Sequence, residues 1–188
     1  MAVELVRHRF SVEEYQRMGQ AGIFSEDDRV ELIEGEIVEM TPIGSRHAAC
    51  VARLTQLFFE KLQGKALLWV QNPLHLSQRS EPQPDLALLK LRQDFYAHSH
   101  PEPKDVLLIV EVADTSLEYD CKVKIPLYAR ALIPEVWLVD LNASTVDAHR
   151  DPSPQGYKQI RSVRQGESLA PQAFSGFALA VVDILGQD

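Results

Sequence analysis

The segment Asp105–Val112, DVLLIVEV, constrains the fold more than any other part of the chain. It is almost wholly apolar, which is typical of a central strand that is covered on both faces of a sheet. A carboxylate inside such a strand costs several kcal/mol unless it is paired, protonated or bound to a cation. Glu111 therefore needs a partner, and the strand predicts a sheet with helices on both sides.

Three helices are expected around that strand, because apolar residues recur at helical spacing between helix start and stop signals. They cover residues 11–20, 46–62 and 118–132, and the first has Ser11 as its N-cap and Glu14 completing a capping box. Pro126 lies inside the third helix and is expected to kink or restart it.

The extended segments complete the predicted fold. ELIEGEIVEM predicts a hairpin around Glu34-Gly35, and residues 66–76 predict one long strand interrupted at Asn72-Pro73. Further strands are expected at 84–89 and 135–141, with an outer antiparallel pair at 145–149 and 157–163. The order of elements predicts an α/β sheet between helices, preceded by an N-terminal helix and hairpin.

Length and composition narrow the class of protein. A chain of 188 residues suits a single domain over residues 1–188, and its two cysteines are too few for a disulfide framework. We expect a cytoplasmic protein without a membrane partner, because the apolar runs are short and the N-terminus is charged. The net charge of −8 disfavours bulk binding to nucleic acid, although a local cationic groove or a metal in an acidic pocket stays compatible with it.

Two carboxylates are the first candidates for chemistry. Asp85 follows Pro84 near the start of one predicted strand, and Glu111 lies near the end of its predicted neighbour. Carboxylates on adjacent strands can point to the same face and share a divalent metal. The alternative is that each one caps a helix or pairs with an arginine.

The third helix offers two lysines, Lys122 and Lys124. They differ by about 200° around a helix, so only one of them can face the sheet. The alternative is that each lysine forms an exposed ion pair with an acid four residues earlier on the helix. These pairs would be Glu118 with Lys122 and Asp120 with Lys124. His47, at the start of the second helix, is either a surface residue or a functional one.

The chain resembles the Uma family of proposed restriction endonucleases, which has the PD-(D/E)XK nuclease fold. The matching segments, in the family's order over roughly residues 10–185, are RVELIEGEIVEMTPIGSRH, NPLHL with PQPDLALL, LLIVEV, DCKVKIPLYA and PEVWLVD. The resemblance implies a restriction-endonuclease-like core, a mixed sheet flanked by helices. It also implies that Asp85 and Glu111 hold magnesium or manganese.

The same resemblance implies a displaced lysine. Ala113 stands where the general pattern has a lysine, two residues after the second acid. The family pattern D-x-x-x-K-x-x-x-Y on the following helix falls on Asp120, Lys124 and Tyr128, which selects Lys124 over Lys122. Accessory roles near the mouth of the cleft fall on Glu31, Glu34 and His47. Asp120, Tyr128 and Lys122 are further candidates for accessory roles. A glycine that often precedes the family's P-E segment is replaced by Leu132.

The resemblance implies a magnesium-dependent DNA endonuclease. The alternatives are a catalytically degenerate nuclease-fold protein that serves as an assembly or regulatory module, and another kind of metal hydrolase. A homodimer is expected, because restriction-type enzymes cut two strands by two-fold symmetry, and Thr145–Val163 offers a surface for it. Two basic sets could line a DNA groove or simply be solubilising charges: Arg46, Arg53 and Lys61, and Lys158, Arg161 and Arg164.

Overall fold

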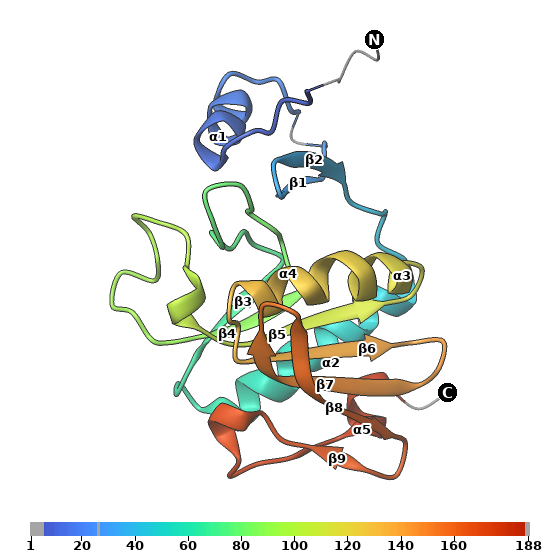
Figure 1. Ribbon diagram of the computed structural model, residues 1–188. Helices are drawn as coiled ribbons and strands as arrows, with labels where there is room; N and C mark the ends of the chain where they lie inside the picture. The colour runs from blue at the N-terminus through green and yellow to red at the C-terminus, as the bar shows by residue number, and fades with distance from the viewer. Residues whose placement is uncertain (1–5, 26, 187–188) are drawn as a thin grey trace.

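A six-stranded mixed sheet forms the centre of the computed structural model, which describes residues 6–25 and 27–186 (Figure 1). The strand order is β3-β4-β5-β6-β7-β8. Only β5 and β6 run parallel, and the other neighbours are antiparallel. The strands are β3 (Leu67–Val70), β4 (Leu86–Leu89), β5 (Val106–Ala113), β6 (Glu135–Asp140), β7 (Thr145–Ser153) and β8 (Gly156–Arg164). The predicted α/β class is confirmed.

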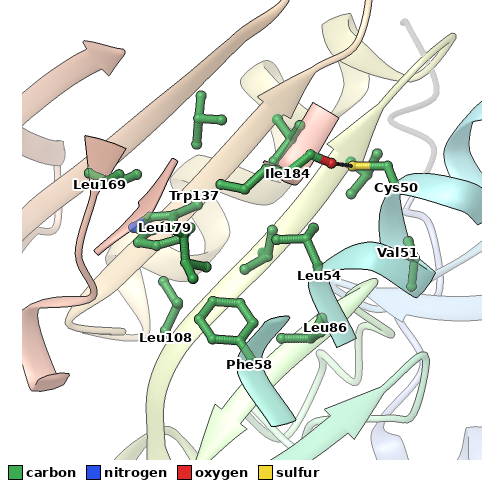
Figure 2. Close-up of a cluster of buried hydrophobic side chains, with 14 of the residues drawn as sticks. Cys50, Val51, Leu54, Phe58, Leu86, Leu108, Trp137, Leu169, Leu179 and Ile184 are labelled. Carbon is green, nitrogen blue, oxygen red and sulfur yellow. Dashed lines mark hydrogen bonds between the residues drawn. The ribbon is translucent and has the colours of Figure 1, made fainter. Parts of the chain in front are cut away.

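Helices cover both faces of this sheet, as the apolar strand β5 requires. On one face the helix α2 (Ser45–Leu62) packs through Leu54 and Phe58 against Trp137 and the β5 residue Leu108 (Figure 2). The short helix α5 (Val181–Leu185) joins the same core. Alternate residues of β5 point to opposite faces, so Ile109 lies in the second core and Glu111 faces the same way.

The second face is covered by one continuous helical segment in three parts. They are α3 (Leu117–Tyr119), the π-helical turn η2 (Asp120–Lys124) and α4 (Ile125–Arg130). The predicted helix over 118–132 is therefore present, and Pro126 lies at the start of α4, directly after the π-helical turn. Among the described residues, no helix is long and apolar enough to span a membrane.

The N-terminal helix and hairpin lie at one end of the sheet (Figure 1). The helix α1 (Val12–Gln20) has the predicted capping box of Ser11 and Glu14. The hairpin pairs β1 (Val30–Ile33) with β2 (Glu36–Glu39). Gly35 lies at its turn with φ +82°, a conformation that glycine adopts without a steric penalty.

One predicted strand is wrong in its second half. The expected strand over 66–76 ends at Val70, and the residues after Pro73 turn away from the sheet. Leu74 donates from its backbone to Pro82, and Glu81 donates to Leu32 of the hairpin at 2.8 Å. Pro73 lacks the N–H that a sheet ladder needs, so this segment instead connects the hairpin to the sheet.

The turn η1 (Pro103–Asp105) directly precedes β5. After β8 come the strand pair β9 (Ser168–Leu169) and β10 (Leu179–Ala180) and the turn η3 (Gln172–Phe174). The outer pair β7 and β8 is longer than predicted but has the predicted antiparallel arrangement.

Leu132 ends the helical segment in a left-handed conformation, with φ +58° and 60% of its surface exposed. The N–H of Ile133 donates to the carbonyl of Tyr128, as in a Schellman cap, where glycine is preferred. We expect Leu132→Gly to raise the free energy of unfolding by about 1 kcal/mol, because glycine removes the steric cost of positive φ. Urea denaturation measures this, and Ala131→Gly, at φ −77°, is the control that should lose stability.

His149 on β7 is buried, and neither of its ring nitrogens has a hydrogen-bond partner among the residues that the structure describes. Burial lowers the pKa of this ring, although the nearby Asp147 opposes that effect. Because the unfolded chain binds the proton more readily, the stability that depends on neutral His149 is lost as pH falls below the ordinary value of 6.5. His149→Phe keeps the ring that packs against Tyr157.

We therefore expect His149→Phe to be more stable than the natural protein, and increasingly so as pH falls from about 7.5 to about 5.5. Urea unfolding at several pH values measures the difference between the two proteins. A constant difference across this range would contradict the assigned role of the histidine.

Candidate active site

The two predicted carboxylates meet where β4 begins and β5 ends. Leu86 pairs with Val110 in the antiparallel register of β4 and β5, so Asp85 lies beside Glu111. The backbone N–H of Asp85 donates to Glu111 Oε2 at 3.3 Å. Both residues line one cavity of about 360 Å³. The sheet thus brings the two acids together, as their positions in the sequence led us to expect.

Asp85 is held between the sheet and α2. Its Oδ2 accepts from the backbone N–H of Val112 and contacts Nε2 of His47, each at 2.9 Å. Gln71 Nε2 approaches Oδ1 at 3.4 Å. The hydrogen bond to Asp85 raises the pKa of His47. The first turn of α2 therefore places His47 in the cavity, and its buried Nδ1 has no partner among the described residues.

Glu111 is almost fully buried and is held by the helical segment on the other face. Tyr128 Oη donates to Glu111 Oε1, and Lys124 Nζ lies 3.2 Å from the same oxygen. Burial raises the pKa of Glu111 to about 8, and the charge of Lys124 opposes this rise. The arrangement leaves Oε2 of Glu111 as the oxygen that faces Asp85.

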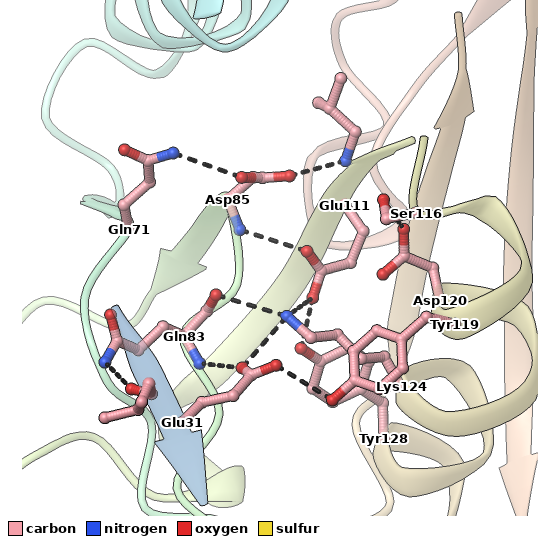
Figure 3. A network of polar contacts seen from close by, with 12 residues as sticks. Glu31, Gln71, Gln83, Asp85, Glu111, Ser116, Tyr119, Asp120, Lys124 and Tyr128 are labelled. Atoms are coloured by element: carbon pink, nitrogen blue, oxygen red, sulfur yellow. Dashed lines mark hydrogen bonds and ion pairs between the residues drawn. The ribbon is translucent and has the colours of Figure 1, made fainter. Parts of the chain in front are cut away.

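Lys124 is clamped between the sheet and the hairpin (Figure 3). Its Nζ lies 3.2 Å from Glu111 Oε1, 3.2 Å from Glu31 Oε2 and 3.4 Å from the carbonyl of Gln83. Burial lowers the pKa of Lys124, but the surrounding carboxylates outweigh it, so the ammonium stays charged. Lys122 points outward instead and pairs with Glu118 at 2.6 Å.

The family-derived pattern Asp120, Lys124 and Tyr128 lies on one buried face of the helical segment. Asp120 lines the cavity and accepts from Ser116 Oγ at 2.6 Å. Burial raises the pKa of Asp120. The alternative interpretation of Asp120 and Lys124 as an exposed helix pair is therefore wrong, because both side chains face the cavity.

Two proposed accessory residues lie outside the cavity. Glu34 occupies the hairpin turn with φ +49°, is exposed, and pairs with Arg130 at 2.8 Å. Residues three apart along a strand point to opposite faces, so Glu34 does not follow Glu31 inward. Lys122 is the second correction, because the rotation of the helix that buries Lys124 exposes it.

The basic residues that the sequence offered as a DNA groove are not gathered beside the acids. Arg53 donates to the carbonyls of Ile184 and Leu185, and so holds α5. Arg46 pairs with Asp114 at 3.1 Å. The second basic set, Lys158, Arg161 and Arg164, lies on β8, which β6 and β7 separate from β5. The interpretation of both sets as one groove beside the carboxylates is therefore wrong.

Several groups of the site were missed from the sequence. Tyr119 Oη donates to Glu31 Oε1 at 3.2 Å, and the backbone of Gln83 contacts both Glu31 and Lys124. Gln83 contacts Glu31 and Lys124 through its backbone N–H and carbonyl, so its residue type could not indicate a place in the site. Arg29 and Asp114 also line the cavity.

Comparisons with known proteins identify a family and a similar fold. A family model described as "Uma2: Putative restriction endonuclease" matches residues 12–182. The fold is similar to the crystal structure of a putative nuclease belonging to DUF820 from Anabaena variabilis ATCC 29413, with a TM-score of 0.72 and 14% identity. That alignment covers 94% of this chain and 97% of the other. A search of curated proteins gave no match.

Proposed function

Because the chain belongs to the Uma2 family of putative restriction endonucleases, we propose that it is a metal-dependent DNA endonuclease of the PD-(D/E)XK type. Membership of this family supports a nuclease function and a nucleic-acid substrate. One observation carries the finer proposal. A lysine from the helix, Lys124, reaches Glu111 at 3.2 Å and so occupies the place that Ala113 leaves without an amine.

The residues present suit a magnesium or manganese ion. Asp85 and Glu111 supply carboxylate oxygens, which these cations prefer, and burial of Glu111 makes a nearby positive charge favourable. Magnesium is commonly held by one or two carboxylates together with waters and substrate phosphates, so Asp85 and Glu111 are a sufficient set of protein ligands for it.

When bound, the metal supplies Lewis-acid polarisation of a phosphodiester and a lowered pKa for the attacking water. Lys124 stabilises the charge that develops on the phosphate, because its ammonium is fixed and shielded from water. Glu31 and Tyr128 orient Lys124 and Glu111. His47 holds the carboxylate of Asp85 in place from the opposite side.

A titration of purified protein with magnesium or manganese, followed by plasmid cleavage at low salt, tests this function. We expect cleavage that depends on the metal and stops when EDTA is added. Intact plasmid at every metal concentration would contradict the endonuclease.

A catalytically degenerate module is the second candidate, and one observation favours it. The three contacts of Lys124 Nζ use all three N–H donors of the ammonium, which leaves none for substrate. In this case the protein binds metal or nucleic acid without cutting. The cleavage assay and a binding assay on the same preparation separate the two candidates.

We also propose a homodimer, since two copies of the chain would place one active site on each strand of a DNA duplex. The strand β8 is at the edge of the sheet, and its Ile160 is 62% exposed. Light scattering at tens of micromolar protein measures the oligomeric state, and a monomer there would contradict the dimer.

A further inference from the structure

Arg29 lines the same cavity as Asp85 and Glu111 but takes no part in the contacts described above. It directly precedes β1, and its carbonyl accepts from the N–H of Met40 at 2.8 Å, which fixes its backbone on the hairpin. Residues two apart on an extended segment point to the same side, so Arg29 faces the way that Glu31 does. The hairpin therefore presents a buried acid and a cation to one cavity.

Arg29 shares the cavity with His47, which contacts Asp85, and with Lys124, which contacts Glu111.

The other cations around the cavity are already paired. Lys124 contacts Glu31 and Glu111, and Arg46 contacts Asp114. Within residues 6–25 and 27–186, the Arg29 guanidinium has no ion pair and no side-chain hydrogen bond. Three of the acids that line the cavity already have other partners: His47 for Asp85, Arg46 for Asp114 and Ser116 for Asp120.

A nucleic-acid strand that enters this cavity meets mostly negative charge. A guanidinium offers five N–H donors in a planar fork, which matches two oxygens of a phosphate. We propose that Arg29 binds a backbone phosphate of the nucleic-acid substrate, next to the scissile one. This inference rests on the proposed nuclease function and adds a substrate-binding residue to it.

A phosphate contact positions the strand without reading its bases. Arg29 therefore sets the register of the backbone across Asp85 and Glu111, and it acts equally on substrates of any sequence. Arg29 directly precedes β1, and Glu31 of β1 contacts Lys124. The hairpin therefore both positions Lys124 and supplies the arginine that binds the substrate.

Binding of a fluorescein-labelled DNA duplex, measured in calcium to prevent cleavage, tests this role. We expect Arg29→Gln to weaken binding by about 10- to 100-fold, as loss of a charge-assisted contact does. The slope of log affinity against log salt should fall in magnitude by about 0.9, since one counterion fewer is released. Arg29→Lys should keep the slope but bind more weakly, because it retains the charge and loses the fork.

Arg161→Gln is the matched control, because Arg161 is an exposed arginine on β8, away from the cavity. If Arg29→Gln binds with the affinity and salt slope of this control while the natural protein binds DNA, the inference is wrong and the proposed function stands. A lowered melting temperature with an unchanged slope makes Arg29 structural and also overturns it. If the natural protein neither binds nor cuts DNA, the proposed function and the inference are both wrong.

Discussion

Replacing Lys124 with methionine is expected to lower the free energy of unfolding by about 3 to 5 kcal/mol, the usual cost of breaking a buried ion pair. Methionine keeps the length of the side chain but leaves Glu31 and Glu111 facing each other without a cation. Both are almost fully buried, so water cannot replace the lost ammonium. Cleavage should also be lost. Urea denaturation and the plasmid assay measure the two effects.

Lys122→Met is the matched control. Lys122 lies two positions earlier on the same helix and carries the same charge, but it is exposed and pairs only with Glu118. Exposed pairs of this kind contribute little to stability. Similar losses of stability in the two variants would show that the helix, and not the buried ammonium, is responsible.

Asp85→Asn is expected to abolish metal-dependent cleavage, with a loss of about 1,000-fold or more, since metal catalysis supplies several kcal/mol. The asparagine carbonyl can still accept from the N–H of Val112 and from His47, so the fold should be kept. The removed charge is what a metal ion needs. Cleavage rates at saturating magnesium, and magnesium affinity by calorimetry, measure the effect.

Asp114→Asn serves as the control for this variant, because Asp114 lines the same cavity and is paired with Arg46. It removes one negative charge from the cavity without touching Asp85 or Glu111. Equal losses of cleavage in the two variants would assign the effect to the overall charge of the cavity and would contradict a specific metal ligand at Asp85.

Most of the sheet could be predicted from the sequence, because each strand and helix carries its own local pattern. The apolar run of β5 identifies a strand covered on both faces, and Ser11 with Glu14 identifies a helix start. The second half of the strand predicted over 66–76 could not be found in this way. Its backbone partners lie in the hairpin, and pairing between distant segments leaves no local trace.

The candidate site was predictable where side chains follow a strand or the family's pattern. Asp85, Glu111 and Lys124 were named from the sequence, and the structure places them together. The choice between Lys122 and Lys124 needed the resemblance, because the phase of the helix near Pro126 was open. Arg29 was overlooked, since an arginine before a hairpin has the same local pattern whether it faces solvent or a cavity.

The π-helical turn over Asp120–Lys124 has a consequence for how this chain can change in evolution. A π-helical turn holds one residue more than an α-helical turn. The wide turn already accommodates this extra residue, so deleting it would restore an α-helix with little rotation of α4 against α3. Residues three apart on an α-helix share a face, as residues four apart do. Relatives that lack one residue of this turn should therefore keep the equivalents of Asp120 and Lys124 on the cavity side, three positions apart.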